Sequence, residues 1–486
     1  METVIVNSSS DGVVSSVPRG GEVVTEVHLK RELGLFSATM IGVGATIGAG
    51  IFVLSGTILA RAGPAALLAF IITGIFALLS AICYIELSTA IPKAGGGFNY
   101  VQESAGGVFG FTAGLLFWLA YVSAAAFYAL GFAEFFKLAT SPDDPEESFL
   151  GAAGVLLIAI LIILLFMTIN IFGAKSAARA ENATTIFKLF TLVIFISVAL
   201  TLVNPRAFEN FAPQGFSPVI AGAAMSFIAF EGFDTIATAA EEMHEPEKTL
   251  PRAVILTFVS AIIIYSLIVI LMAGIISTED LKDAVDEGTE ELLVFDVART
   301  AIGGFGFWLL LVGGMVAACS ALNAVIFASS RVMYAMGREK LLPLPIRRLH
   351  PRLAIPYYAI LVSSFSAIVL CIIASTSEQV IELMAELASL AFRICFGLVF
   401  ISLIVLRRKR PDMKRPFKIP FYPWLPIIGL ASVIFFAGII PLDAWLILLT
   451  VFVFGVFYYL IVVMKARSLS RMIEILKRDF RRILIK

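Results

Sequence analysis

Charged side chains are scarce in this chain of 486 residues. Asp, Glu, Lys and Arg make up 15% of it and hydrophobic residues 59%, whereas ordinary globular domains have about 25% charged and about 45–50% apolar residues. The composition therefore predicts a polytopic membrane protein rather than a soluble domain. The net charge of zero carries little information, because orientation depends on which loops hold Lys and Arg.

Histidine and cysteine are also rare. The three histidines fall in the N-terminal tail or in predicted loops, and the four cysteines fall in apolar segments without a Cys-x-x-Cys spacing. Neither a disulfide framework nor a metal cluster is therefore indicated, and no Ser–His–Asp, Cys–His or metal-spaced set lies near the membrane midplane. We expect no enzymatic activity, no metal, no cofactor and no nucleic-acid partner. A cleavable apolar N-terminal stretch is missing too, so no signal peptide is expected.

The chain has instead a series of long apolar runs. A membrane-spanning helix needs about 20 apolar residues, and this rule predicts about twelve spans in a transporter domain over residues 29–464. The runs lie at 36–59, 65–90, 107–138, 149–170, 184–203, 216–239, 253–276, 303–330, 355–375, 380–406, 423–441 and 443–464. Residues 1–28 predict a disordered tail. Residues 465–486 predict a basic amphipathic helix on anionic lipid.

The loops divide by charge. Even-numbered connections and both tails hold about 29 of the 36 Lys and Arg residues, which predicts that both termini are cytoplasmic. The longest outer loop, 277–302, predicts a short helix or two that starts at Ser277. On the inner side, residues 92–98 contain three glycines and either dip back toward the core or form a flexible turn.

Four glycines, at positions 42, 44, 48 and 50, interrupt the first span. Each glycine inside a helix costs about 1 kcal/mol relative to alanine, and lipid offers no partners for open backbone groups. We interpret the stretch as a broken helix whose freed backbone binds a small polar ligand. The alternatives are close packing of helices at small residues and a nucleotide-binding loop, which needs a strand and an aqueous crevice that a span does not provide.

Charged residues inside a span usually mark function, because a buried charge costs a few kcal/mol or more. Glu231 and Asp234 flank Gly232 in the sixth span, which repeats the combination of glycine and polar groups seen in the first. Two interrupted spans five apart predict related repeats, at about 36–204 and 216–406, with a site near the midplane. The last two helices, at about 423–464, stand outside this repeat.

Lys188 lies about a turn and a half into the fifth span. A lysine near a helix end can extend its ammonium to the membrane interface. Alternatively, the amine is buried against the first and eighth spans, where it gains and loses a proton. For Arg393 in the tenth span, we favour a structural role over a role in transport.

A set of short motifs appears in a fixed order along these spans. They are Gly44-Ala-Thr-Ile-Gly-Ala-Gly-Ile-Phe52, Tyr84-Ile-Glu-Leu87, Ile91-Pro-Lys-Ala-Gly-Gly-Gly97, Phe230-Glu-Gly-Phe-Asp-Thr-Ile-Ala-Thr238, Leu250-Pro-Arg252, and Ser330-Arg-Val-Met-Tyr-Ala-Met-Gly-Arg338 followed by Leu341-Leu-Pro343. The set resembles the amino acid–polyamine–organocation (APC) superfamily of transporters, and within it the cationic amino acid transporter-like branch. The resemblance implies an all-α fold of two inverted five-helix repeats plus two further helices, with helices 1 and 6 broken, and secondary transport of amino acids.

The resemblance also implies a substrate site. The substrate carboxylate is expected against the backbone N–H groups of Gly48, Ala49 and Gly50, because helix N-termini bind anions. The substrate ammonium is expected against backbone carbonyls, which are those of Thr46, Ile47, Ile228 and Glu231. Selectivity should then come from side chains on facing spans: Tyr121, Ala124, Ala125, Tyr128, Phe230, Glu231, and Ala324 or Val325.

The same resemblance places Lys188 where proton-coupled members carry a lysine in place of a sodium ion. Its expected neighbours are carbonyls near Gly42 and Val43 and the hydroxyl of Ser320. Asp234 is a candidate for a second protonatable group. Glu231 departs from the small or aliphatic residue that is usual at its position, and it could recognise an ammonium or a guanidinium.

We therefore expect a proton-coupled symporter of amino acids, cationic ones among the candidates, that works by alternating access in the plasma membrane. The nearest alternative is an exchanger of amino acids or polyamines on the same fold, in which Lys188 is structural. A more distant alternative is a channel or a ligand-sensing membrane protein.

Overall fold

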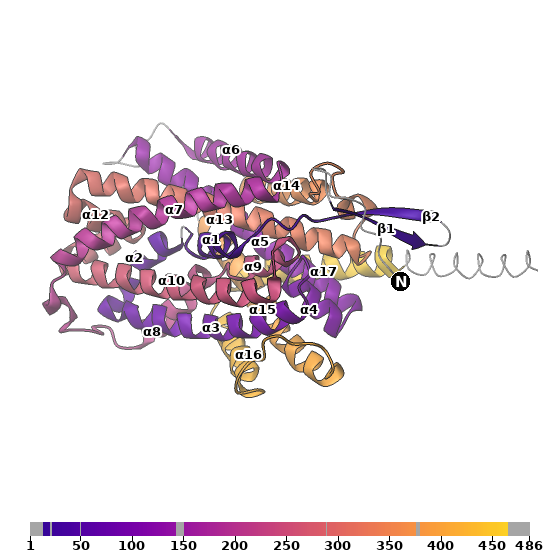
Figure 1. The fold of residues 1–486 in the computed structure, drawn as a ribbon. Helices are drawn as coiled ribbons and strands as arrows, with labels where there is room; N and C mark the ends of the chain where they lie inside the picture. Colours follow the sequence, from indigo (N-terminus) through magenta and orange to yellow (C-terminus); the bar gives the residue numbers. More distant parts are fainter. Residues whose placement is uncertain are drawn as a thin grey trace, which may run out of the picture.

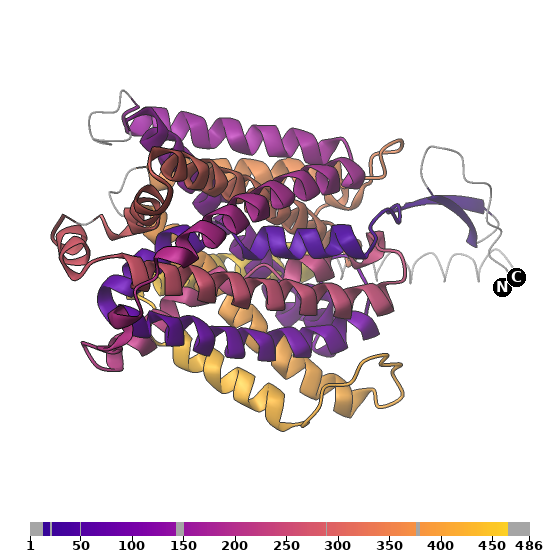
Figure 2. The same ribbon diagram turned by 60° about the vertical axis from the view of Figure 1, so that its left-hand side comes forward.

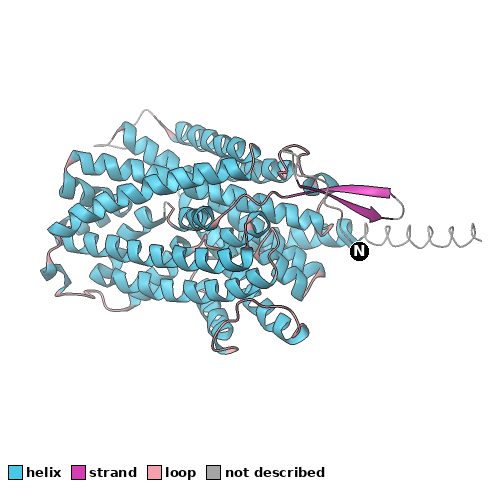
Figure 3. Ribbon diagram, viewed as in Figure 1, coloured by secondary structure: helices cyan, strands magenta, loops and turns pink. Residues whose placement is uncertain are grey.

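Long apolar helices that run side by side make up most of the molecule (Figure 1 and Figure 3). The computed structural model describes residues 13–19, 22–48, 50–141, 150–287, 289–375 and 380–464. Within these ranges, nine helices are long and apolar enough to cross a membrane, and two shorter apolar helices lie at 357–373 and 424–437. The prediction of an all-α polytopic membrane protein is confirmed, while a total of twelve crossings stays a prediction.

Each predicted apolar run contains at least one helix. In chain order these are α1 (Leu35–Thr46) and α2 (Gly50–Ala62), α3 (Ala66–Ala90), α5 (Gly107–Thr140), α6 (Ala152–Ile171), α7 (Ala174–Ala199), α8 (Ser217–Met225) and α9 (Asp234–Thr238), α10 (Pro246–Ile275), α13 (Gly304–Arg338), α14 (Tyr357–Ala374), α15 (Val380–Lys409), α16 (Trp424–Ala437) and α17 (Leu442–Tyr458). A π-helical turn, Tyr459–Val463, follows α17.

The first and sixth spans are broken, as predicted. Between α1 and α2 the chain leaves the helix at Ile47, whose ψ is 71°. The sixth span runs through α8 and a 3-10 helix (Ser226–Phe230), is interrupted at residues 231–233, and resumes as α9. Both breaks lie in the interior of the bundle, where backbone groups can find partners inside the protein.

Helices α5, α13 and α15 form the inner part of the bundle. More than 70% of the apolar segment of each of these helices is buried inside the protein. The buried share is 28% for α6 and 22% for the segment that contains α17. In Figures 1 and 2, α6 and α16 lie at opposite outer edges. The inner helices therefore face the two breaks, and the outer ones present apolar side chains outward.

On one side of the bundle, helices extend beyond the predicted apolar runs. We call this side the basic face, because the Arg- and Lys-rich loops 339–356 and 410–423 lie there, where α1, α7 and α10 begin and α13 and α15 end. There α7 begins ten residues before the predicted span and α13 ends eight residues after it. Polar residues such as Glu, Lys and Arg are good helix formers, so helices continue beyond the segment that hydropathy detects.

The N-terminal tail contains a hairpin, which the prediction of a disordered tail missed. Strands β1 (Val13–Arg19) and β2 (Glu22–His28) pair antiparallel, with Val13 opposite His28, and the hairpin lies beyond the start of α1 (Figure 2). Both segments are rich in valine, and a Gly-Gly pair between such segments is typical of a two-residue hairpin turn. Residues 1–12 and the predicted amphipathic tail, 465–486, lie outside the described residues.

Two loops follow the predictions. Residues 277–302 form α11 (Thr278–Glu287) and α12 (Leu293–Ile302), and the hydroxyl of Ser277 accepts a hydrogen bond from the N–H of Asp280, as a helix cap does. The glycine-rich loop after α3 dips into the protein, where Gly95 donates to the carbonyl of Thr238 at 3.4 Å, and leads into α4 (Gly97–Ser104).

The start of the first span is joined to the end of the sixth at the basic face. The N–H groups of Glu32 and Leu33 donate to the carbonyl of Glu242, and His244 donates to the carbonyl of Leu33, all at 2.9 Å. The Glu242 carboxylate in turn binds the guanidinium of Arg331 on α13 at 2.8 Å, with both side chains fully buried. Three spans are thus linked at one point.

Candidate functional site: two broken helices and a buried lysine

Lys188 lies at the first break. It is fully buried in α7. Its ammonium donates hydrogen bonds to the carbonyls of Gly44 (2.9 Å) and Ile47 (2.6 Å), with that of Val43 at 3.4 Å. It also donates to the hydroxyl of Ser320 on α13 at 3.1 Å. The last carbonyls of a helix lack backbone partners, so the ammonium supplies the donors that the interruption of α1 removes.

The expected neighbours of Lys188 are close to those observed. The carbonyl of Val43 and the hydroxyl of Ser320 are in place, but Gly44 takes the position expected near Gly42. The reason is that α1 continues to residue 46, so the carbonyl of Gly42 still accepts a bond within the helix. The N–H of Gly48 bonds to the carbonyl of Thr46 at 3.0 Å, which leaves the carbonyl of Gly44 to the ammonium.

A carboxylate that the sequence analysis did not single out completes this cluster. Glu181 is fully buried on α7, seven residues before Lys188, and two helical turns place both on the same face. Its Oε1 accepts hydrogen bonds from Ser320 (2.6 Å) and Thr185 (3.2 Å), and its Oε2 accepts one from the amide of Asn323 (2.7 Å). The spacing of seven could have revealed Glu181, but the residue precedes the apolar run that hydropathy detects.

Glycines of the first span make room for these groups. A Cβ on Gly44 would lie 1.7 Å from the Oε1 of Glu181, and one on Gly48 would lie 2.8 Å from the ring of Tyr128. Close packing, the alternative interpretation of these glycines, therefore accounts for part of them. It accompanies the broken helix and does not replace it.

The second break depends on Gly232 and Asp234. Gly232 has a φ of +117°, and a Cβ there would lie 2.7 Å from the carbonyl carbon of Ala45 on α1. Glycine is needed both for this conformation and for the close approach of the two broken spans. Asp234 begins α9 and accepts a hydrogen bond of 2.5 Å from the hydroxyl of Tyr121 on α5. Its other oxygen has no hydrogen-bond partner among the described residues.

Glu231 and Arg393 lie on the other side of the second break. The Oε1 of Glu231 accepts a hydrogen bond of 3.3 Å from Ser389 on α15, and its Oε2 has no such partner within the described ranges. Arg393 donates to the carbonyl of Ala224 at 2.5 Å, and its guanidinium lies 4.9 Å from the ring centre of Phe227. These contacts fasten α15 to the sixth span, which agrees with a structural role for Arg393.

Tyr265 connects the two breaks. From α10, its hydroxyl lies 2.7 Å from the carbonyl of Thr46 and 2.6 Å from that of Ala229. A hydroxyl has one proton and donates to one acceptor at a time. Because the carbonyl of Thr46 also accepts from the N–H of Gly48, the carbonyl of Ala229 is the one that keeps acceptor capacity when Tyr265 bonds to Thr46. It lies in the region where the resemblance implies a substrate ammonium.

Some predicted backbone contacts of a substrate have other partners here. The N–H of Gly48 donates to the carbonyl of Thr46 at 3.0 Å, and the carbonyl of Ile47 accepts from the buried lysine. Gly50 begins α2, and the first N–H groups of a helix have no partner within it, so that end keeps donors suited to a carboxylate. Outside the described residues lie Ala49 and the side chain of Ile228.

The side chains predicted to select among amino acids surround the breaks without all facing them. Tyr121 is held by its hydrogen bond to a carboxylate, and the ring of Phe230 packs against Tyr265, 5.0 Å between centres. Ala125 and Val325 are buried small residues on the two central helices, α5 and α13.

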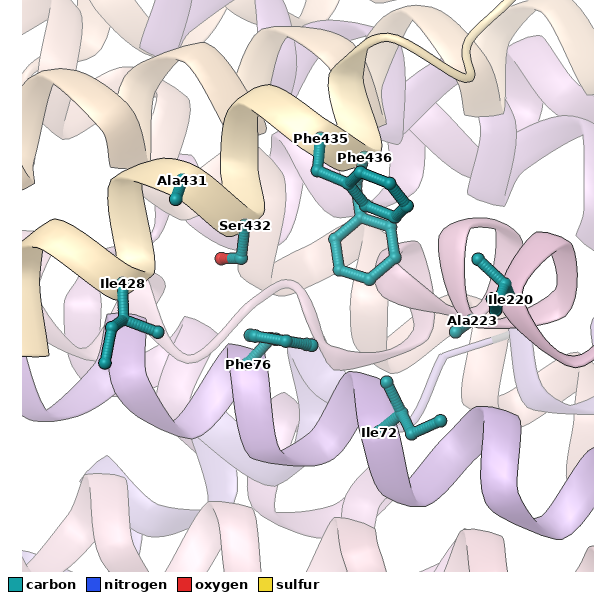
Figure 4. A pocket seen from close by; sticks show the side chains of 9 residues that line it. All are labelled: Ile72, Phe76, Ile220, Ala223, Ile428, Ala431, Ser432, Phe435 and Phe436. Carbon is teal, nitrogen blue, oxygen red and sulfur yellow. The ribbon is translucent and has the colours of Figure 1, made fainter.

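A cavity of about 370 Å³ lies elsewhere, between α3, α8 and α16 (Figure 4). Ser432 is its one polar lining residue; the others are Ile72, Phe76, Ile220, Ala223, Ile428, Ala431, Phe435 and Phe436. A zwitterion there would leave both charges without partners, which is costly. This cavity is therefore not the amino acid site.

A helical membrane protein with two broken spans and ionisable groups at both breaks has the architecture of a secondary transporter. Comparison with known proteins agrees. Residues 33–466 match the amino acid permease family, so the chain belongs to that family and to the APC superfamily. The family consists of transporters, which confirms that the protein is not an enzyme. The cationic amino acid branch stays a prediction.

Three relatives show the range of named substrates. The methylthioribose transporter of Bacillus subtilis is 31% identical over 429 residues, covering 86% of this chain and 90% of its own length. The branched-chain amino acid permease BcaP of the same organism is 29% identical, covering 84% and 88%. Its serine/threonine exchanger SteT is 28% identical, covering 84% and 91%.

Proposed function

We propose that this protein transports amino acids across the plasma membrane by alternating access, with substrate bound between the two breaks and with Lys188 coupling transport to protons. The observation that carries the proposal is the ammonium of Lys188 on the carbonyls of Gly44 and Ile47. The same backbone segment is the proposed substrate site, so loss of a proton from the amine would change the segment that holds the substrate.

An amino acid fits the groups that the breaks present. The start of α2 offers N–H donors to a carboxylate, and the carbonyl of Ala229 offers an acceptor to an ammonium when Tyr265 bonds to Thr46. Relatives named for branched-chain amino acids and for serine or threonine support this class of substrate. The Oε2 of Glu231 has no hydrogen-bond partner among the described residues, although the charge of Arg393 acts on this carboxyl group. An oxygen of this kind suits a positively charged side chain, so cationic amino acids belong among the substrates to be tested.

For orientation, we propose that the basic face is cytoplasmic. Positively charged loops stay on the cytoplasmic side of a membrane, and the loops 339–356 and 410–423 lie at this face. Both termini are then inside, and the basic segment 465–486 lies on anionic lipid of the inner leaflet.

Reconstituted vesicles test the proposal. Uptake of labelled amino acids, in competition with each of the twenty, should identify the substrate, and an inward proton gradient should drive its accumulation. Lys188→Ala should lose this proton-driven accumulation, whereas Lys175→Ala, an exposed position on the same helix, should keep it. Unchanged accumulation in Lys188→Ala would reject the coupling role.

The alternative is an exchanger, and SteT is a relative named as one. In that case vesicles loaded with unlabelled substrate would exchange it for labelled substrate, while the proton gradient would leave uptake unaffected. The same preparation therefore separates symport from exchange.

A further inference from the structure

We propose that Glu181 is a second proton-binding site, which passes the transported proton between Lys188 and the basic face through the hydroxyl of Ser320. The inference rests on the proposed proton coupling and adds to it a route. Lys188 is fully buried, so a proton reaches or leaves it only through groups that can accept and donate one.

The route is a continuous chain of hydrogen bonds. The ammonium of Lys188 donates to the oxygen of Ser320 at 3.1 Å, and the hydroxyl of Ser320 donates to the Oε1 of Glu181 at 2.6 Å. Both distances lie within the normal range for hydrogen bonds. A single hydroxyl therefore separates the buried ammonium from the buried carboxylate.

The transfer needs two protons to shift by one bond each. The N–H bond of Lys188 breaks as its proton joins the oxygen of Ser320, while the original proton of that hydroxyl leaves and bonds to the carboxylate of Glu181. The products are a neutral amine, an unchanged hydroxyl and a neutral carboxylic acid. The net charge is unchanged, because one positive and one negative charge are neutralised together, and no other reactant is required.

The surroundings of Glu181 hold the carboxylate in place for this step. Asn323 accepts a hydrogen bond from Asn170 through its Oδ1 (3.0 Å), which directs its amide N–H group toward the Oε2 of Glu181. On α1, Gly44 lies against the carboxylate, since a Cβ added there would be 1.7 Å from its Oε1. The titratable groups that face Glu181 are Lys188 on α7 and the thiol of Cys319 on α13.

The chain of bonds leads from the break toward the basic face. Seven residues of helix place Glu181 about 10 Å closer to the start of α7 than Lys188 is. A cavity of about 10 Å³ adjoins the carboxylate there; it is lined by Ile41, Ala177, Ala178, Glu181, Asn323, Ala324 and Phe327. That volume is about the smallest that holds one water molecule, which would continue the route beyond Glu181.

The substitutions Glu181→Gln and Ser320→Ala test the route. Gln keeps the size of the side chain and, with its oxygen toward Asn323, still accepts that hydrogen bond. Its NH2 group on the Ser320 side donates instead of accepting, and the side chain cannot take up a proton. Thr185→Val is the matched control, because it removes a donor to Glu181 and a hydroxyl 3.0 Å from Ser320 but keeps the bonds from Lys188 to Ser320 and from Ser320 to Glu181. The readouts are proton-driven accumulation, substrate-induced acidification inside the vesicles, and exchange of labelled for unlabelled substrate without a gradient.

We expect Glu181→Gln and Ser320→Ala each to reduce proton-driven accumulation and acidification more than about tenfold, as loss of a positioned proton acceptor does. Exchange should fall far less, and Thr185→Val should stay close to the wild type. Infrared difference spectra over a pH range should show a protonated carboxyl band in the wild type that is missing in Glu181→Gln.

Full proton-driven accumulation in Glu181→Gln would overturn the inference and leave the role of Lys188 standing. If that variant does not fold, Ser320→Ala decides in the same way, since it keeps Glu181. Wild-type vesicles without any proton-driven accumulation would overturn the proposed coupling itself, and the proton route with it. Equal losses of exchange and accumulation in both variants would indicate a structural role and also contradict the route.

Discussion

At the first break the freed carbonyls are held by a cation from a neighbouring helix, whereas at the second break the ionisable groups belong to the broken span itself. Lys188 on α7 supplies the donors to Gly44 and Ile47. In the sixth span, Asp234 accepts from Tyr121, and Gly232 lies against the backbone of α1.

The difference separates two ways of stabilising an interrupted helix. The first break depends on a charge that can be removed by loss of a proton. The second combines the backbone conformation of Gly232, which no change of protonation affects, with the carboxyl groups of Asp234 and Glu231, which bind Tyr121 and Ser389. We therefore expect loss of a proton to free backbone carbonyls at the first break, whereas at the second a change of protonation alters side-chain contacts and leaves the backbone turn in place.

The largest effect is expected from Gly232→Ala. A side chain there meets the carbonyl carbon of Ala45 and must also adopt a φ of +117°, a conformation that costs about 1–3 kcal/mol for residues other than glycine. The folded yield and the thermal midpoint of the purified protein should drop sharply. Gly303→Ala is the control, because Gly303 also has a positive φ but open space around it; an equal loss in both variants would show that packing against α1 is unimportant.

A smaller effect on folding, but a large one on binding, is expected from Gly48→Val. The added side chain meets the ring of Tyr128 rather than backbone, and a ring can shift. The protein should fold and lose substrate binding, measured by equilibrium binding of labelled substrate. Gly50→Ala, whose Cβ would make an ordinary contact of 3.7 Å, should bind more tightly than Gly48→Val. Near-normal affinity in Gly48→Val would contradict the site assignment.

An intermediate effect is expected from Tyr121→Phe. It removes the donor to the buried carboxylate of Asp234, and a buried polar group without its partner costs about 1–3 kcal/mol. Asp234→Asn keeps a hydrogen-bonding group toward Tyr121 and should destabilise the protein less. Thermal midpoints of the two variants in the same detergent check this order. A lower midpoint for Asp234→Asn would show that the charge of Asp234 stabilises the protein through groups other than Tyr121.

The smallest effect is expected from Tyr265→Phe. The variant removes a single neutral hydrogen bond that the two breaks share, and such a bond contributes about 0.5–1.5 kcal/mol net. The apparent affinity for substrate should change by less than about tenfold, which uptake curves measure. A complete loss of transport would show that Tyr265 does more than connect the two spans.

Hydropathy and glycine content predicted the two broken spans and singled out Lys188, which the structure buries at the first of them, because apolar length and a charge within a span are visible in the sequence. Glu181 was missed because it lies among polar residues at the start of a helix, where hydropathy falls although the side chain is buried. The hydrogen bond from Tyr121 to Asp234 and the hydrogen bond from Tyr265 to the two breaks depend on how distant helices pack. No local pattern encodes them.

The hairpin also shows what a composition argument misses. Residues 1–28 have the Ser and Gly content of a disordered tail, yet valines and a Gly-Gly pair suffice for β1 and β2 to form. Composition averages over the tail, whereas strand pairing depends on the order of a few residues within it.

The junction at the basic face has a mechanical consequence. The N–H groups of Glu32 and Leu33, just before α1, both donate to the carbonyl of Glu242. The carboxylate of Glu242 is bound to Arg331 on α13. A movement that takes the start of α1 away from α13 at the basic face must therefore also move the end of the sixth span. The ion pair between Glu242 and Arg331 therefore ties both broken spans to α13, and a substitution that removes one partner leaves the other charge buried and alone, at a cost of about 3–5 kcal/mol.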